Sequence, residues 1–241
     1  NRFFVSANYV YSRLYGNYAG LGNSDEISTP TTGVSSATTQ QSGGSIARPG
    51  STGSRAWDLD QYLFDSHGQF VTGRLATDRP HVFKAYGSYK FKWGTDVGGF
   101  YYAGSGTPIS TVVNQAQRIP LFVEGRGSMG RTPILTQTDL LVGHELRFGE
   151  MKRLRFEFNA QNIFNQKTAR HIFNQLNRGA GSGDPASALN LTNTNLFQGY
   201  DYMAKLNAIK ATGKDPFDPR YGMPDLFNTG FVGRLMVKFT F

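Results

Sequence analysis

Residues 231–241 read FVGRLMVKFTF, and this stretch decides the fold. Counted back from Phe241, every second residue except Gly233 is apolar, whereas the intervening positions carry Lys238 and Arg234. Because successive side chains of a strand point to opposite faces, the stretch predicts a strand with one apolar and one polar face. Such a strand is typical of a membrane barrel, with lipid outside and a wet lumen inside. It equally fits the last edge strand of a soluble sandwich or barrel.

The composition favours the membrane alternative. Charged residues make up 17% of the 241 residues, below the roughly 25% of soluble domains. The 29 glycines and the 14% of aromatic residues suit a barrel wall with aromatic girdles. No apolar run is long enough for a transmembrane helix. The net charge of +8 comes from scattered cations without a basic run, so we do not expect nucleic-acid binding. The absence of cysteine excludes disulfides and Cys-ligated metals.

Five further segments alternate like the last one, which predicts an all-β fold. In the second of them, Phe83 and Ala85 alternate with Lys84 and Tyr86. The six predicted strands are residues 2–14, 80–92, 96–105, 135–148, 153–164 and 231–241. They are longer than the mode of about 5–6 residues in soluble proteins. They match the roughly 9–11 residues that a tilted strand needs to cross a bilayer.

The connections between these strands alternate between long and short. Residues 16–77, 106–133 and 165–229 form long loops, whereas 93–95 and 149–152 form tight turns. In an antiparallel sheet this order places every long loop at one end. Outer-membrane barrels show this sorting, with short periplasmic turns and long outer loops, and a soluble sandwich has no reason for it.

Two expectations follow for the rest of the architecture. Within the third long loop, residues 169–178 and 202–211 are predicted as short helices. Six strands cannot close a barrel, because the smallest membrane barrels have about eight and an open edge in lipid leaves backbone groups unsatisfied. We therefore expect the missing wall to precede residue 1.

Several short motifs are spread over the whole chain. They are ANYVYS at 7–12, TDRPH at 77–81, YAGSGTP at 102–108, NIFN at 162–165, DPRYG at 218–222 and the final Phe241. Together they resemble the C-terminal end of TonB-dependent receptors of the Oar-like type. The resemblance implies that residues 1–241 are the last six strands of a 22-stranded transmembrane antiparallel β-barrel. Its long loops would be extracellular and its short turns periplasmic, and an N-terminal plug and TonB box would lie upstream.

The resemblance also implies a function. It places the chain in the outer membrane of a Gram-negative bacterium and implies import of a bulky ligand, such as a metal chelate or an oligosaccharide. The implied partners are TonB, membrane lipid or lipopolysaccharide, and the barrel assembly machinery, for which Phe239 and Phe241 resemble the assembly signal. An alternative is an adhesion or surface-structural barrel whose loops bind partner proteins or cells. A soluble hydrolase lacks a plausible catalytic pairing, so we expect neither an enzyme nor a cofactor.

Cations on the polar side of the predicted strands are the main candidate site. These lumen-facing candidates are Lys84, Lys90, Arg147, Arg155, Arg234 and Lys238. They could attract an anionic ligand, or they could simply line a solvated barrel interior. A set of tyrosines is expected near the outer rim, either as girdle and loop packing or as a stacking surface for a glycan or chelate. These are Tyr15, Tyr18, Tyr62, Tyr101 and Tyr102.

Three other patterns are weaker. Asp215, Asp218 and Asp225 form a possible Ca²⁺ loop, although their spacing fits no EF-hand and the nearby prolines favour simple turns. Residues 125–130 match GxGxxG, but a strand pattern follows where a dinucleotide site needs a helix, so we expect a loop. The histidines lack the spacing of metal ligands on one element, and we expect His144 on the lipid side near a turn; the four are His67, His81, His144 and His171.

Overall fold

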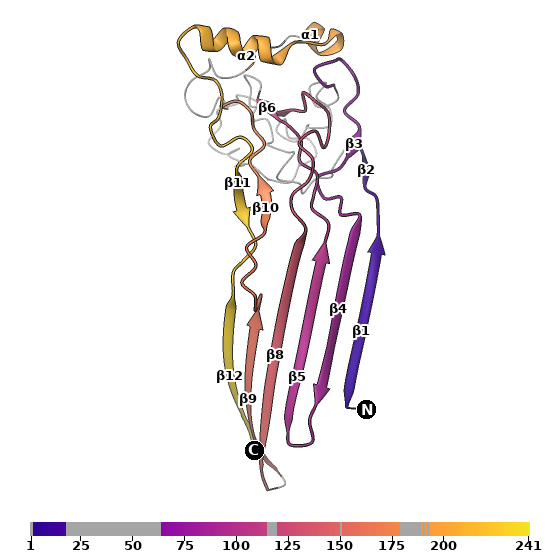
Figure 1. Ribbon diagram of the computed structural model, residues 1–241, viewed down its shortest axis with the longest axis vertical. Coiled ribbons are helices and arrows are strands. Elements are labelled where there is room, and N and C mark those ends of the chain that lie inside the picture. Colours follow the sequence, from indigo (N-terminus) through magenta and orange to yellow (C-terminus); the bar gives the residue numbers. More distant parts are fainter. Residues whose placement is uncertain are drawn as a thin grey trace, which may run out of the picture.

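The structure is a computed structural model that describes residues 2–17, 64–114, 120–149, 151–178, 189, 191 and 193–241. Its main feature is one antiparallel sheet in the order β1-β4-β5-β8-β9-β12 (Figure 1). The strands are β1 Phe3–Tyr11, β4 His81–Lys90, β5 Thr95–Gly104, β8 Leu135–Phe148, β9 Lys152–Gln161 and β12 Val232–Thr240. All six strands predicted from the alternating pattern are confirmed, and each pairs with its neighbours along the chain.

The two short connections of the sheet lie at one end, and the described parts of the three long ones lie at the other (Figure 1). The turn between β4 and β5 is closed by the Phe91 N–H, which donates to the Thr95 carbonyl at 2.7 Å. Gly94 has a φ of 92° in this turn, a conformation that favours glycine. The predicted sorting of the connections is therefore confirmed. We refer to the two ends as the turn end and the loop end.

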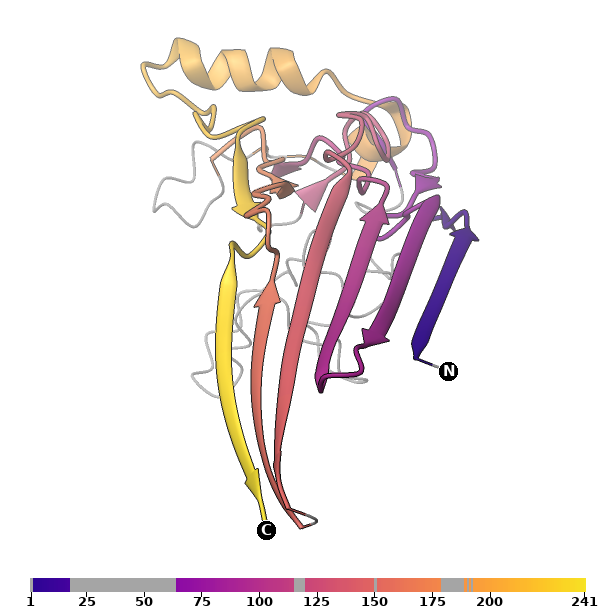
Figure 2. The same cartoon turned by 60° about the horizontal axis from the view of Figure 1, so that its bottom comes forward.

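At the loop end, the described parts of the long connections form a layer of their own. This loop layer comprises residues 12–17, 64–80, 105–114, 120–134, 162–178, 189, 191 and 193–231. Its elements are β2 Tyr15–Gly16, β3 Gly73–Arg74, β6 Val113–Asn114, β7 Pro120–Leu121, β10 Ala169–Ile172, α1 Asn193–Gln198, α2 Tyr202–Ala211 and β11 Pro224–Phe227. The two helices lie farthest from the sheet (Figures 1 and 2). Neither of them is long and apolar enough to cross a membrane.

The hydrophobic core that the structure describes lies in the loop layer. Its largest fully buried side chains include Phe122 and Leu121 of the second connection, Val71 of the first and Leu206 of α2. Among the described residues of the six long strands, Ala160 is the one buried apolar side chain. The sheet is thus a single layer, whereas the connections fold as a packed unit.

One of the two helix predictions is confirmed and the other is wrong. Residues 202–211 form α2, which begins after Asp201, whose carboxylate accepts a hydrogen bond from the Ala204 N–H at 2.8 Å. In the segment 169–178, Ala169–Ile172 instead form β10, which pairs antiparallel with β11. The partner strand comes from more than 50 residues away in the chain. A tertiary pairing of this kind overrides local helix propensity.

The register divides the six-stranded sheet into two faces. Directly paired residues share a face, so Leu235 and Phe158 belong together, as do Lys238 and Arg155. The apolar face carries Phe3, Val5, Tyr9, Tyr11, Phe83, Tyr89, Tyr101, Leu146, Phe148, Phe156, Leu235, Val237 and Phe239. These side chains are 38–76% exposed. The described helices and short strands gather beyond the loop end of the sheet (Figure 2). The exposure of these side chains shows that the described residues leave the apolar face uncovered.

Candidate functional site

The other face of the sheet, the polar face, collects the predicted cations. The continuous pairing of Lys90 with Asp96, Asp96 with Gly143 and Gly143 with Glu157 shows that these strands present the same side. By this register all six lumen-facing candidates share the polar face: Lys84, Lys90, Arg147, Arg155, Arg234 and Lys238. Arg153 joins them, and four carboxylates oppose them, namely Asp96, Asp139, Glu145 and Glu157. Seven cations against four carboxylates leave the face positively charged.

Arg155 is the centre of the charge network on this face. Its guanidinium donates two hydrogen bonds to the Asp96 carboxylate, at 2.6 and 2.8 Å, and two to the Glu157 carboxylate, at 3.2 and 3.3 Å. Arg155 lies on β9 and Asp96 lies on β5, so the side chain crosses the whole of β8. It crosses at Gly143, where a Cβ atom would collide with the guanidinium. A glycine at this position is therefore what lets the two charges meet.

The remaining cations divide into paired and unpaired groups. Arg147 donates to Glu145 at 2.9 Å, and Arg153 reaches the same carboxylate at 3.9 Å. Four cations form no ion pair with any residue that the structure describes, namely Lys84, Lys90, Arg234 and Lys238. The site can thus offer positive charge to an anion mainly through these four and through Arg153.

Asp78 of the TDRPH motif ties the loop layer to the sheet. Its fully buried carboxylate accepts a hydrogen bond from the Leu14 N–H at 2.7 Å and pairs with the guanidinium groups of Arg131 and Arg74. Burial alone would raise the pKa of this carboxyl, but the Leu14 N–H and the Arg131 guanidinium together hold it below its usual range. The motif therefore joins the first and second long connections at one buried charge.

The neighbouring residues of this motif extend the same join. The Arg79 guanidinium donates to the Ser105 carbonyl at 2.5 Å, which joins the start of β4 to the end of β5. Nδ1 of His81 lies 2.7 Å from the Tyr9 hydroxyl, across the β1–β4 pair. These contacts explain the motif as a structural element of the loop end.

The NIFN motif fixes the loop ends of β9 and β12. Asn162 and Asn165 have φ values of 51° and 49°, in the left-handed region that asparagine tolerates. The Asn162 amide donates to the Thr229 carbonyl at 2.8 Å, and its backbone N–H donates to Asp139 at 2.8 Å. The Asn165 side-chain oxygen accepts from the Phe231 N–H at 3.1 Å. The motif thus sets where the last strand begins.

The three aspartates of the possible calcium loop do not converge. Asp218 of the DPRYG motif is held by the Arg220 guanidinium at 2.8 and 3.0 Å, and this pairing lowers the pKa of its carboxyl. The Asp225 carboxylate lies 2.5 Å from Nδ1 of His171. The Asp215 carboxylate accepts a hydrogen bond from the Phe217 N–H at 3.3 Å. Among the described residues, no three Asp, Glu, His or Cys side chains are grouped to hold a metal.

The GxGxxG segment has the geometry of successive turns. Gly125, Gly127 and Gly130 have φ values of 76°, 79° and 84°. The Arg126 guanidinium between them stacks on the Phe122 ring at 4.7 Å. No helix follows within the described residues 120–134, so the expectation of a loop is confirmed.

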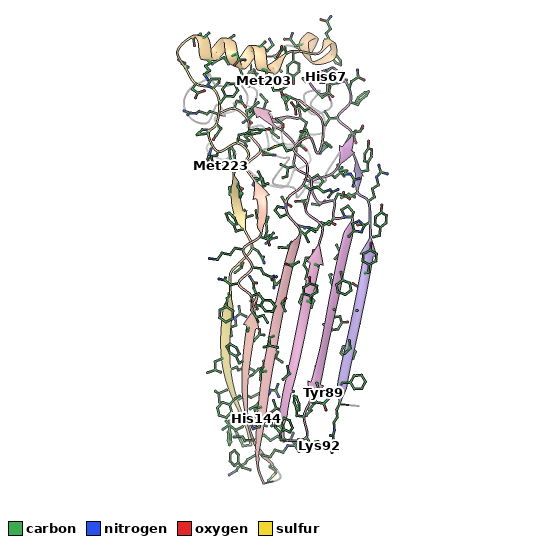
Figure 3. The ribbon with its side chains drawn as sticks, in the orientation of Figure 1. His67, Tyr89, Lys92, His144, Met203 and Met223 are labelled. Carbon is green, nitrogen blue, oxygen red and sulfur yellow. The ribbon has the colours of Figure 1, made fainter. Side chains whose placement is uncertain are left out.

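The histidines are dispersed over the molecule. His81 contacts Tyr9 at the loop end, and His144 lies near the turn end, with its Nδ1 2.8 Å from the Thr95 hydroxyl. The register places His144 on the apolar face, as expected. Figure 3 shows it far from His67, which lies beside the helices.

The rim tyrosines that the structure describes do not lie together on one face of the sheet. Tyr101 and Tyr102 lie on opposite faces of β5, and Tyr15 lies under the Arg13 guanidinium at 5.0 Å. Tyr18 and Tyr62 lie outside the described residues.

The last two aromatic side chains of the chain stack on each other. The Phe239 and Phe241 ring centroids are 6.0 Å apart, and Phe241 is 89% exposed. Phe239 belongs to the apolar face, next to Leu154 of β9. The pair therefore presents aromatic surface at the turn end of that face.

Comparison with known proteins gives one informative similarity. The chain is 31% identical over 167 residues to the TonB-dependent transporter Oar of Myxococcus xanthus. The match covers 67% of this chain, which spans about 13% of the length of that transporter. No family model matches the chain, and no solved structure matches it. The similarity supports a distant relationship to TonB-dependent transporters.

Proposed function

We propose that residues 1–241 form part of the barrel wall of an outer-membrane TonB-dependent receptor that imports a bulky ligand. The observation that carries this proposal is the two-faced sheet, whose uncovered apolar face lies behind a charged polar face. The partial similarity to the transporter Oar supports it independently. No catalytic step is part of the proposal.

Lipid is the solvent that suits the apolar face. Leu235 is 76% exposed and Val5 is 73% exposed, at opposite edges of the sheet. Contiguous apolar surface of this extent is rare on soluble monomers, and exposing it to water would be costly. In a bilayer the same surface is solvated by acyl chains, and the polar face would then line the lumen.

The proposed barrel needs further strands. The outer edges of β1 and β12 have no partner strand among the described residues. Such an edge cannot face lipid, because its backbone groups would stay without hydrogen bonds. In the proposed receptor, the six strands therefore belong to a larger closed barrel, with 22 strands if it follows the Oar-like receptors that the sequence resembles.

In this arrangement the loop layer faces outward and captures the ligand, and the turn end faces the periplasm. The lumen-facing cations favour an anionic ligand, such as a ferric chelate. Coupling to TonB, a plug and assembly by the barrel machinery are parts of the same proposal. So is location in the outer membrane of a Gram-negative bacterium.

Membrane fractionation tests the proposal directly. The full-length protein should sediment with the outer membrane, resist extraction by salt and alkali, and require detergent. Cells without it should grow more slowly when a ferric chelate or an oligosaccharide is the sole source of iron or carbon. A protein that alkali releases from the membrane fraction would contradict the proposal.

Adhesion is a second candidate, favoured by the packed loop layer. Its own hydrophobic core, with Phe122 and Leu206 fully buried, makes it a preformed surface at the outer end. An uncoupler that collapses the proton gradient separates the two functions. Import should stop in treated cells, whereas attachment of cells or partner proteins should continue.

A further inference from the structure

A hollow opens on the polar face beside the charge network of Arg155. Its floor lies where Ser88 on β4 pairs with Gly98 on β5, and where Gly98 pairs with Leu141 on β8. Because Gly98 has no side chain and Ser88 has a small one, the face is lower there than around it. The hollow measures about 320 Å³, within the range of about 300–1,000 Å³ for small-molecule sites. On β8 and β9 it lies in the half of each strand nearer the loop layer.

Three aromatic rings border this hollow. They belong to Phe4 on β1, Tyr86 on β4 and Phe100 on β5. Tyr86 and Phe100 are directly paired and share the polar face. The ring centroids of Phe4 and Tyr86 are 5.7 Å apart, and these two side chains are 54% and 46% exposed. Exposed apolar surface rimmed by polar residues is typical of a binding site.

Neutral polar groups lie in the same hollow. The side-chain amides of Asn159 and Gln161 on β9 form no hydrogen bond with any residue that the structure describes. The same is true of the hydroxyl groups of Ser88 and Tyr86 within the described part of the chain. An amide offers both donors and an acceptor, and so does a hydroxyl. The hollow therefore combines aromatic rings with free neutral groups that can bind hydroxyls.

A carboxylate lines the hollow, and a cation lies at its margin. The Asp139 carboxylate accepts hydrogen bonds from the Gln137 amide at 3.0 Å and from the Asn162 N–H at 2.8 Å, so it is already satisfied. Lys84 lies two residues from Tyr86 on the same face of β4, about 7 Å along the strand. It forms no ion pair with any described residue. A ligand with an uncharged body and an anionic substituent suits this arrangement.

We propose that the hollow binds an acidic oligosaccharide. A pyranose ring has C–H groups on its faces and hydroxyls at its edge. One such face packs on Tyr86 and Phe100, the hydroxyls of the chain bind Asn159 and Gln161, and an acidic substituent reaches Lys84. A compact ferric chelate would use Lys84 but leave the rings and the amides without contacts. This inference rests on the proposed function, because a ligand enters the polar face only if that face lines a lumen, and it narrows the ligand to one chemical class.

Titration calorimetry on the full-length protein in detergent tests the stacking. The probes are trimers of galacturonate, glucuronate and mannuronate, and we expect at least one of them to bind. Phe100→Ala should weaken that binding about tenfold, through loss of a ring contact. The matched control is Tyr101→Ala, which removes the neighbouring ring on the apolar face and should leave the affinity unchanged. Absence of binding by all three trimers, or equal affinity of Phe100→Ala and the original protein, would overturn the proposal.

Lys84→Gln separates the contribution of charge from that of stacking. It alters an exposed side chain, so the variant should fold even if Phe100→Ala does not. The probe is the trimer that binds, together with its methyl ester, which lacks the charge. Lys84→Gln should weaken binding of the acid about tenfold and leave binding of the ester unchanged. An equal effect on both forms, or no effect on either, would contradict an acidic ligand.

A cysteine at position 88 reports whether the hollow is open in the whole protein. In a background without other cysteines, Ser88→Cys should react with a water-soluble maleimide, and the bound trimer should slow that reaction several-fold. A cysteine that stays unlabelled would show that the rest of the protein covers the hollow, and labelling that the trimer does not slow would place the sugar elsewhere. Either result overturns this inference. If the protein still fractionates with the outer membrane, the proposed function stands without it.

Discussion

Asp78 is the residue on which the loop layer depends most. Its carboxylate is fully buried against Arg131 and the Leu14 N–H, so Asp78→Asn removes a charge that a guanidinium requires. We expect this substitution to lower the free energy of unfolding of the loop layer by about 1.5–3 kcal/mol, which is the range for hydrogen bonds to charged groups. Hydrogen exchange of the amides around Val71 and Phe122 measures it. Asp215→Asn, which alters an exposed turn, is the control and should change exchange little. Equal protection in both variants would show that Asp78 does not hold the layer.

The same residue predicts how the loop layer responds to acid. The pKa of Asp78 is lower in the folded protein than in the unfolded chain, where it lies near its usual value of about 3.9. The stabilisation is therefore complete above that value and is lost as the pH falls through the folded pKa. Hydrogen-exchange protection should fall progressively below about pH 4. In Asp78→Asn this part of the acid dependence should disappear, and a variant that keeps the full dependence would assign it to other groups.

At the scale of a strand, Gly143 controls the polar face. It is the gap in β8 through which Arg155 reaches Asp96. Gly143→Ala should displace the guanidinium and lower the unfolding free energy by about 1 kcal/mol, since this pair is partly exposed and screened. Denaturant unfolding in detergent measures the loss. In the Asp96→Asn background the alanine should cost less, because the ion pair is already weakened. If Gly143→Ala lowers the unfolding free energy equally in both backgrounds, the glycine does not act through the ion pair of Arg155 and Asp96.

The six long strands could be predicted from sequence because their pattern is local. Alternation over nine or more residues needs no knowledge of partners, so both the strands and their faces emerge from residues such as Lys84 and Leu235. The strand β10 was missed because its four residues are strand only through pairing with β11. The two-residue strands of the loop layer and its core were missed for the same reason.

The candidate site shows the same division between local and long-range information. The alternation of side chains along each strand predicted that six cations share one face, and the same alternation predicts that Arg153 lies with them. The link between Arg155 and Asp96 depends on the register of three strands and on the gap at Gly143. The convergence of Leu14, Arg131 and Asp78 likewise depends on how separate loops pack. The TDRPH motif marked the place, but its role required the structure.

For the whole molecule, the decisive question is which solvent each face of the sheet meets. The last strand offers a matched pair for this, because Leu235 and Met236 are adjacent, both exposed and on opposite faces. If the apolar face meets lipid, Leu235→Arg places a charge in hydrocarbon and should cost about 2–4 kcal/mol near the bilayer midplane. Met236→Arg faces the proposed lumen and can be hydrated there. In water, both arginines would be tolerated alike.

The two variants therefore separate a membrane wall from a soluble sheet with a single measurement. The amount of folded, detergent-extracted protein in the outer-membrane fraction should fall several-fold for Leu235→Arg and stay near the original level for Met236→Arg. Reversible unfolding in lipid vesicles should show the same order. Because Met236 sits opposite Glu157, an arginine there also gains a nearby carboxylate. Equal, small effects of both substitutions would mean that water covers both faces, and the barrel proposal would then be wrong.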